Sequence, residues 1–266
     1  MKIDIEAMPG EGGALLWPAP AGVPSCFKVV FATRVAVATE GPGFVNYGFD
    51  GIPGAAEARR NLCRLTGLNF DKLTVGRQKH TATAAVVDES LAGTGRDAPN
   101  ESLAATDALI TGLRGVPLGV TTADCVPVLL ADPTAKAAAA VHAGWRGTVA
   151  GIVANTIEGM KRNFGSAPQN ISAFLGPAIG PCCYEVGDDL LDQLPNGDMI
   201  FVEKREGRNY LNLYSWNAAR LCDEGLDPKN IYVSEICTCC RPDLFFTYRG
   251  DKNCRGLNFS MIARLG

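Results

Sequence analysis

The chain is poor in histidine: its 266 residues include only two, His80 and His142. This scarcity excludes every site that needs more than two imidazoles from one chain. Long hydrophobic runs are missing as well, since no stretch approaches the roughly 20 apolar residues that a membrane-spanning helix requires. We therefore expect a protein without a membrane partner, whose chemistry uses at most two histidines.

An excess of basic residues is also missing. The net charge at pH 7 is -3, which gives no electrostatic reason to expect nucleic-acid binding. The first residues carry acids and lack the apolar centre of a signal peptide. Ten cysteines in a chain of this length without an export signal indicate reduced thiols rather than disulfides. We expect a cytoplasmic monomer that acts on a small molecule and has no nucleic-acid partner.

The chain contains no sequence repeat, low-complexity tract or long charged linker. This continuity predicts one domain over residues 1–266, in which residues 1–25 form a variable N-terminal segment. Segments rich in β-branched and apolar residues predict strands at 28–33, 73–76, 84–87, 116–121, 126–131, 136–141, 171–175 and 231–234.

Apolar residues at helical spacing and helix-capping residues predict helices at 54–66, 148–164 and 215–225. Gly165 would end the second helix, and Ser215 would cap the third. Strands and helices do not alternate regularly, so the expected fold is of the α/β (α+β) class, with mixed β-sheets flanked by helices. Segments 88–105 and 176–187 are predicted loops, long enough to line a pocket.

Residues 126–141 have the pattern of a β-hairpin. Two apolar runs flank the sequence Asp-Pro-Thr-Ala, which is typical of a turn between antiparallel strands. If Ala131 faces Lys136 across this loop, the same register puts Cys125 directly opposite His142. Directly opposed residues share a face of the sheet, with Cβ atoms roughly 5 Å apart. A slip of one residue would separate them.

In this register Cys125 and His142 would be two ligands of one metal ion, with His80 as the third. Two imidazoles and a thiolate with one open position form the pattern of a catalytic zinc site. The spacing alone does not place His80 near the other two. A single cysteine beside apolar residues is more often buried filler, and a single histidine is more often structural. The predicted opposition in one hairpin favours the metal site.

Other polar residues lie beside these motifs. Arg146 precedes a predicted helix, where its guanidinium could bind a phosphate or carboxylate; a solvated surface arginine is an equal alternative. Arg34 is a similar but weaker candidate at the end of a strand. Asp124 would orient a metal ligand or simply end a strand. The cysteines of segment 237–240 form a tight group, but no further Cys or His lies at ligand spacing, so a second metal is not expected there.

Several motifs together carry a resemblance to a known family. In chain order they are Phe31-Ala-Thr-Arg34, Gln78 with His80, Thr106-Asp107-Ala108, Ala123-Asp124-Cys125, His142-Ala-Gly-Trp-Arg-Gly147, Gly176-Pro177, Tyr184-Glu185-Val186-Gly187, Cys237-Thr238 and Tyr248-Arg249. With them the chain resembles the YfiH, or laccase-domain, family, also described as multicopper polyphenol oxidases and as peptidoglycan editing factors. The resemblance covers nearly everything from about residue 28 onward. The pairs Cys182-Cys183 and Cys239-Cys240 are richer in cysteine than the typical pattern.

The resemblance implies a zinc- or copper-binding enzyme with ligands at His80, Cys125 and His142, the set already reached from the residues. Family members are described as purine nucleoside enzymes that perform phosphorolysis of adenosine, inosine and methylthioadenosine and that deaminate adenosine. In this interpretation Cys125, His142 and Arg146 take part in catalysis, and Arg146 and Arg34 bind the substrate or phosphate. The implied fold is similar to that of certain cysteine-dependent toxin deamidases.

Two other functions would use the same residues. A copper-dependent polyphenol oxidase is compatible with a single His/Cys/His copper, although two histidines do not suffice for a multicopper cluster. A hydrolase that edits peptidoglycan precursors would use Cys125 as its nucleophile and His142 as its base, without metal. The nucleoside enzyme is favoured, because a water of lowered pKa explains adenosine deamination directly.

Overall fold

Two mixed β-sheets form the centre of the structure, a computed structural model that describes residues 24–38, 41–44, 54–97, 103–254 and 256–266. In the first sheet the strand order is β1 (Phe27–Ala32), β16 (Asn258–Arg264), β8 (Leu118–Thr122), β4 (Thr74–Arg77) and β6 (Leu103–Ala104). In the second it is β15 (Ile231–Val233), β11 (Ser172–Leu175), β9 (Val126–Asp132), β10 (Ala137–Ala143), β7 (Ala108–Thr111) and β5 (Ala84–Val86). Each sheet contains parallel and antiparallel pairs, which confirms the predicted mixed sheets.

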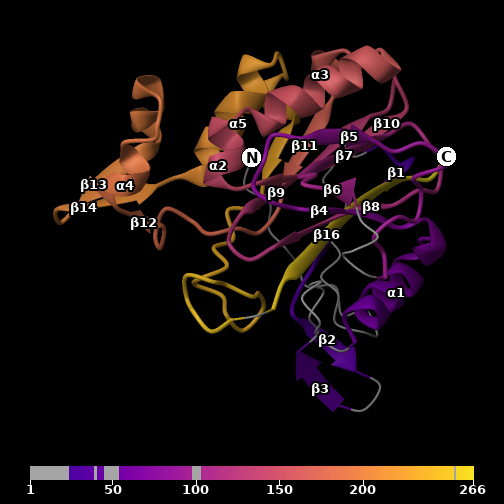
Figure 1. Cartoon of the computed structure of the whole chain (residues 1–266), viewed down its shortest axis with the longest axis horizontal. Coiled ribbons are helices and arrows are strands. Elements are labelled where there is room, and N and C mark those ends of the chain that lie inside the picture. The colour runs from indigo at the N-terminus through magenta and orange to yellow at the C-terminus, as the bar shows by residue number, and fades with distance from the viewer. Residues whose placement is uncertain (1–23, 39–40, 45–53, 98–102, 255) are drawn as a thin grey trace.

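The two sheets lie face to face, with helices on their outer sides (Figure 1). Phe27 and Val29 of β1 belong to the apolar cluster between the sheets. Val30 and Ala32 of the same strand belong to the cluster under α1 (Ala55–Thr66), because successive side chains of a strand point to opposite faces. Burial on both faces explains the nearly continuous apolar runs from which the central strands were predicted.

The outer face of the second sheet is covered by α3 (Ile152–Phe164), whose apolar stripe is buried as predicted. The predicted single helix over 148–164 is wrong, because the chain forms two helices there. The short helix α2 (Trp145–Val149) ends before Gly151, whose φ of 84° lies in the left-handed region. Gly165, with a φ of 70°, ends α3 as expected.

The third predicted helix is present as α5 (Leu213–Asp223), which lies beside α3 (Figure 1). Its cap is Asn212 rather than Ser215, because the Asn212 side chain accepts the backbone N–H of Ser215 at 3.0 Å. Among the described residues, no helix combines the length and the apolar character needed to span a bilayer.

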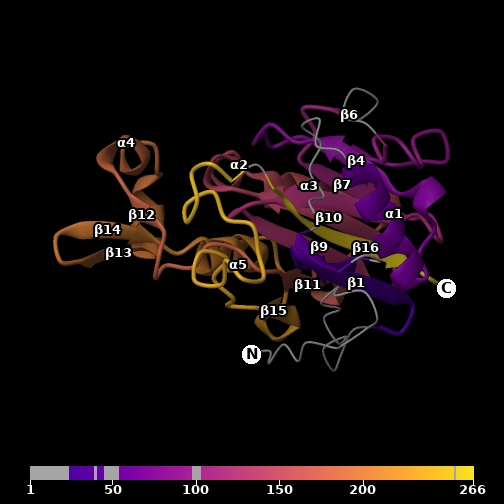
Figure 2. The same cartoon turned by 90° about the horizontal axis from the view of Figure 1, so that it is seen from below.

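A smaller three-stranded sheet and a short helix extend away from the two central sheets (Figures 1 and 2). This part consists of β12 (Glu185–Val186), β14 (Arg208–Leu211), β13 (Val202–Arg205) and α4 (Asp188–Leu191). A separate pair of strands is formed by β2 (Val35–Ala38) and β3 (Gly41–Phe44). The variable segment predicted for residues 1–25 lies almost entirely outside the described residues.

Strands β9 and β10 form the predicted hairpin, but the predicted register is wrong by two residues. His142 is paired with Pro127, not with Cys125. The shift arises at the turn, where Asp132 continues the strand and its Oδ1 accepts two backbone N–H groups of the loop at 2.9 Å. Because side chains alternate with a period of two, this shift leaves Cys125 and His142 on the same face.

Candidate metal centre

Three side chains that are distant in the sequence meet beside the ends of strands from both sheets. His142 lies on β10, Cys125 lies directly before β9, and His80 lies in the loop after β4. One ring nitrogen of each histidine and the Cys125 sulfur all lie within 4.8 Å of one another. The structure therefore brings together the three residues that were predicted as metal ligands.

The spacing of these atoms fits one first-row metal ion. Cys125 Sγ lies 3.8 Å from His80 Nε2, and the two imidazole centres are 4.7 Å apart. Around a tetrahedral zinc, bonds of about 2.3 Å to sulfur and about 2.0–2.1 Å to nitrogen would place two such atoms ~3.6 Å apart. His142 is buried, Cys125 is half-buried and His80 is exposed, so the group opens to solvent beside His80. This exposure leaves room for a fourth ligand.

Asp107, which is fully buried, binds the side chain of His142 and the backbone of His80. Its Oδ1 accepts Nδ1–H of His142 at 2.8 Å and the backbone N–H of His80 at 2.9 Å. Its Oδ2 accepts the backbone N–H groups of Lys79 and Thr81 at 3.0 and 2.9 Å. With Nδ1 of His142 bound to Asp107, Nε2 is the ring nitrogen left for a metal.

The same contacts control the charge of Asp107 and the conformation of the His80 loop. Burial would raise the pKa of Asp107, but hydrogen bonds from His142 and from the backbone of Lys79 and Thr81 hold it well below its usual range. His80 has a φ of 58°, which is uncommon for a residue with a side chain. Three successive N–H groups bound to one carboxylate fix the loop in this conformation.

Asp107 is a site residue that sequence reasoning missed, since it was named only within the family motif. The available signal was a single carboxylate directly before the apolar run that forms β7. Asp124, considered instead as the residue that orients a ligand, binds elsewhere: its carboxylate accepts the Thr238 hydroxyl and the backbone N–H of Arg249, each at 2.7 Å. Asp124 therefore fixes the turn before Cys125, and the carboxylate that orients an imidazole is Asp107.

The surroundings of Cys125 and His142 favour the charged form of each side chain. Burial would raise the pKa of Cys125, but the charge and hydrogen bond of His142, together with a hydrogen bond from His80, lower it to about 6. Burial would lower the pKa of His142, but the Cys125 thiolate and Asp107 raise it to about 9. Both shifts favour a thiolate at Cys125, the form that binds a metal ion and the form that acts as a nucleophile.

Gly144 leaves the space in which Cys125 and His80 approach each other. A Cβ atom at this position would lie 2.7 Å from Cys125 Sγ and 3.1 Å from His80 Cδ2. The φ of Gly144 is -79°, which any residue can adopt, so the requirement is steric rather than conformational. The glycine of the His-Ala-Gly-Trp sequence is thus explained by the site.

Arginine and tyrosine side chains lie around the three predicted ligand residues. Arg146 is exposed in the first turn of α2, and its guanidinium lies 4.3 Å from the centre of the Trp145 ring. Tyr184 is close enough to Cys125, Arg249 and Arg146 to respond to their charges; burial and the Cys125 thiolate raise its pKa, and the two arginines oppose this. Arg249 lies over the Tyr184 ring at 5.2 Å. Tyr184 and Arg249 were not predicted as site residues.

Arg34, predicted as a substrate-binding residue, is held by the segment that precedes Arg249. Its Nη1 donates to the carbonyl oxygen of Pro242 at 3.1 Å, and its guanidinium lies 4.5 Å from the centre of the Phe246 ring. These contacts bind the Arg34 guanidinium to a neighbouring segment and occupy one of its N–H donors. A role of Arg34 in substrate binding stays a prediction.

Comparison with known proteins identifies the family. Residues 28–265 match the family model described as multi-copper polyphenol oxidoreductase laccase. The chain belongs to this family. It is 35% identical to adenosine deaminase RL5 from an unknown prokaryotic organism over 232 residues, which cover 85% of this chain and 88% of that protein. The predicted resemblance to the laccase-domain family is confirmed.

Two further matches concern one protein of Geobacillus stearothermophilus. The chain is 34% identical to its purine nucleoside phosphorylase YlmD over 211 residues, 77% of each chain. The crystal structure of YlmD from that organism superposes with a TM-score of 0.87 at 31% identity, covering 96% of this chain and 97% of YlmD. The likeness covers the whole α/β architecture described above.

Proposed function

We propose that this chain is a metal-dependent purine nucleoside enzyme that deaminates adenosine and performs phosphorolysis of adenosine, inosine and methylthioadenosine. The observation that carries the proposal is the His80, Cys125 and His142 group, open to solvent on one side and oriented by a buried carboxylate. The names of two relatives, an adenosine deaminase and a purine nucleoside phosphorylase, support the substrate class.

The donor set fits zinc, and copper is the alternative metal for two imidazoles and a thiolate. When bound, zinc supplies Lewis acidity that lowers the pKa of a coordinated water to about 7. His80, Cys125 and His142 would hold the ion, and Asp107 keeps His142 in the tautomer that binds through Nε2. Deamination then exchanges the 6-amino group of adenosine for an oxygen from water and releases inosine and ammonia.

Phosphorolysis needs a second binding site, for phosphate. Arg146 is the proposed residue, because it is exposed beside the centre and carries a planar guanidinium suited to bidentate contact with an oxyanion. Arg34 is the weaker candidate for the same role. In this reaction the bond between the base and ribose C1′ breaks, a phosphate oxygen bonds to C1′, and the purine leaves with a proton as the free base.

The experiment is product analysis with metal-depleted and metal-reconstituted protein. Zinc-loaded protein is expected to form inosine and ammonia from adenosine, and to form adenine with ribose 1-phosphate only when phosphate is added. Cys125→Ser should abolish both reactions, whereas Cys222→Ser, an exposed position on α5, should leave both unchanged. Zinc-replete protein that forms neither product would exclude the nucleoside function.

A metal-free Cys/His hydrolase, with peptidoglycan precursors as substrates, is the second candidate. It is supported by the lowered pKa of Cys125 and the raised pKa of His142, which favour a thiolate beside an imidazolium, since such pairs act as nucleophile and acid–base group in cysteine hydrolases. Hydrolysis that persists after metal removal and is lost when Cys125 is alkylated would support this candidate. Oxidation of phenols only by copper-loaded protein would instead indicate a laccase-like activity.

A further inference from the structure

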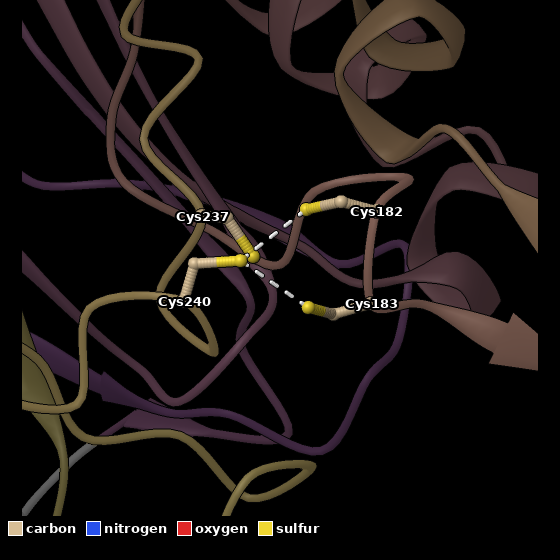
Figure 3. Close-up of side chains that lie close together, drawn as sticks. All are labelled: Cys182, Cys183, Cys237 and Cys240. Carbon is tan, nitrogen blue, oxygen red and sulfur yellow. Dashed lines mark hydrogen bonds between the residues drawn. The ribbon is translucent and has the colours of Figure 1, made fainter.

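A second group of cysteines lies outside the candidate metal centre. Cys182 and Cys183 come from the loop between β11 and β12, and Cys237 and Cys240 follow β15 (Figure 3). The four sulfur atoms all lie within 4.8 Å of one another. Cys240 Sγ is 3.6 Å from Cys182 Sγ and 3.4 Å from Cys183 Sγ. Segment 237–240 alone offers too few ligands at zinc spacing, because the other two cysteines of the group come from a distant loop.

The backbone, rather than the sulfur atoms, brings the two segments together. Ala178 forms a parallel β-bridge with Cys237, in which its N–H donates to Ile236 and its carbonyl accepts from Thr238, at 3.2 and 2.9 Å. The carbonyl of Gly180 then accepts the N–H groups of residues 183 and 184, each at 3.0 Å, in a turn that directs both cysteines of the loop toward the bridge. The positions of the four sulfurs are therefore set by main-chain hydrogen bonds.

Gly180 fits this arrangement in two ways. Its backbone N–H donates to Cys237 Sγ at 3.2 Å, a contact that stabilises a thiolate bound to a metal. A Cβ atom at Gly180 would lie 3.2 Å from both Cys182 Sγ and Cys237 Cβ. Any side chain would therefore crowd the space among the sulfurs.

We propose that Cys182, Cys183, Cys237 and Cys240 bind a second zinc ion with a structural role. Around a tetrahedral zinc, four bonds of about 2.3 Å place the sulfurs ~3.8 Å apart, close to the distances here. A disulfide would need two sulfurs at about 2.05 Å, far closer than any of these distances. An iron–sulfur cluster would hold some of the sulfurs further apart, because its four cysteines are divided between two iron atoms in a [2Fe–2S] cluster and among four in a [4Fe–4S] cluster. The two ligands from 237–240 have the C-x-x-C spacing typical of structural zinc sites.

Asp124 connects the second cysteine group to the first centre through two hydrogen bonds. Thr238, between two of the proposed ligands, donates its hydroxyl hydrogen to Asp124 Oδ1 at 2.7 Å. Asp124 directly precedes Cys125, and its carbonyl accepts the N–H of Ile179, on the loop that carries the other two ligands, at 2.9 Å. A zinc held by the four cysteines would therefore fix the turn that positions Cys125.

The test is zinc analysis of full-length protein purified under reducing conditions. We expect two zinc ions per chain in the wild type and in Cys222→Ser, whose exposed thiol belongs to neither group. The double variant Cys182→Ser/Cys240→Ser should retain one. His80→Ala/Cys125→Ser should also retain one, and X-ray absorption should show that ion bound by sulfur alone, at about 2.3 Å.

The last variant leaves all four cysteines of the second group intact, so its result stands even if the cysteine double variant fails to fold. Nitrogen ligands around its remaining zinc would overturn the proposal. The proposal would also be overturned by wild-type protein with one zinc whose four cysteines are alkylated as thiols or joined as disulfides. Because these readouts require no turnover, failure of the nucleoside function would not affect them.

Discussion

Replacing Asp107 by Asn tests the role of this carboxylate in organising the metal centre. The two carboxylate oxygens accept hydrogen bonds from His142 Nδ1 and from the N–H groups of three successive residues, 79 to 81. An amide has only one oxygen, so in either orientation its NH₂ group faces at least two donors. If the NH₂ group faces His142, Nδ1 must accept its hydrogen bond, so the imidazole proton moves to Nε2. Nε2 is the nitrogen that would bind the metal, and its proton blocks this.

Loss of such a carboxylate partner typically weakens metal binding by about 10–100-fold, equivalent to ~1.4–2.7 kcal/mol. We expect Asp107→Asn to weaken the zinc affinity of the first centre by this factor, measured by competition titration with a chromophoric chelator. The variant should also lose activity at sub-saturating zinc. Asp243→Asn is the matched control, because Asp243 forms an exposed ion pair with Arg241. Unchanged zinc affinity in Asp107→Asn would show that this carboxylate does not orient a metal ligand.

Three further predictions concern residues around the same centre. Gly144→Ala should weaken zinc binding at least as much as Asp107→Asn while its melting temperature changes little, because the new Cβ would lie 2.7 Å from Cys125 Sγ; normal zinc affinity would contradict this. In metal-free protein, the alkylation rate of Cys125, followed by peptide mass spectrometry, should fall as pH drops through about 6, because protonation removes the thiolate. His142→Ala should move this midpoint to higher pH, and an unchanged midpoint would show that the imidazolium does not cause the shift. Arg146→Ala should raise the KM for phosphate at least tenfold and leave deamination within about twofold, unlike Arg162→Ala on α3, which should change neither.

Much of the fold could be predicted from the sequence because the central strands are buried on both faces. Strand β16 was missed, since its polar residues interrupt the apolar pattern. Asn258 is buried there because its side chain accepts the N–H of Phe246 and donates to the same residue's carbonyl, each at 2.8 Å. When the hydrogen-bond partners of a buried polar residue lie far away in the sequence, the local sequence pattern does not show that the residue is buried.

Local patterns predicted the pairing of Cys125 with His142, whereas His80 was included for its residue type and by the family resemblance. The hairpin brought Cys125 and His142 together despite the wrong register, because a shift of two residues preserves the face. Asp107 could not be found in that way, since its contact with His142 depends on the pairing of β7 with β10. The second cysteine group was missed for the same reason, because a single bridge between distant loops creates it.

We propose that His80, Cys125 and His142 bind one metal ion with an open position. Anomalous diffraction at the zinc absorption edge from crystals of zinc-replete protein would show the ion itself. We expect a peak about 2.3 Å from Cys125 Sγ and about 2.0–2.1 Å from one nitrogen of each imidazole, with density for a non-protein fourth ligand. A crystal with zinc bound elsewhere and no peak among these three side chains would contradict it.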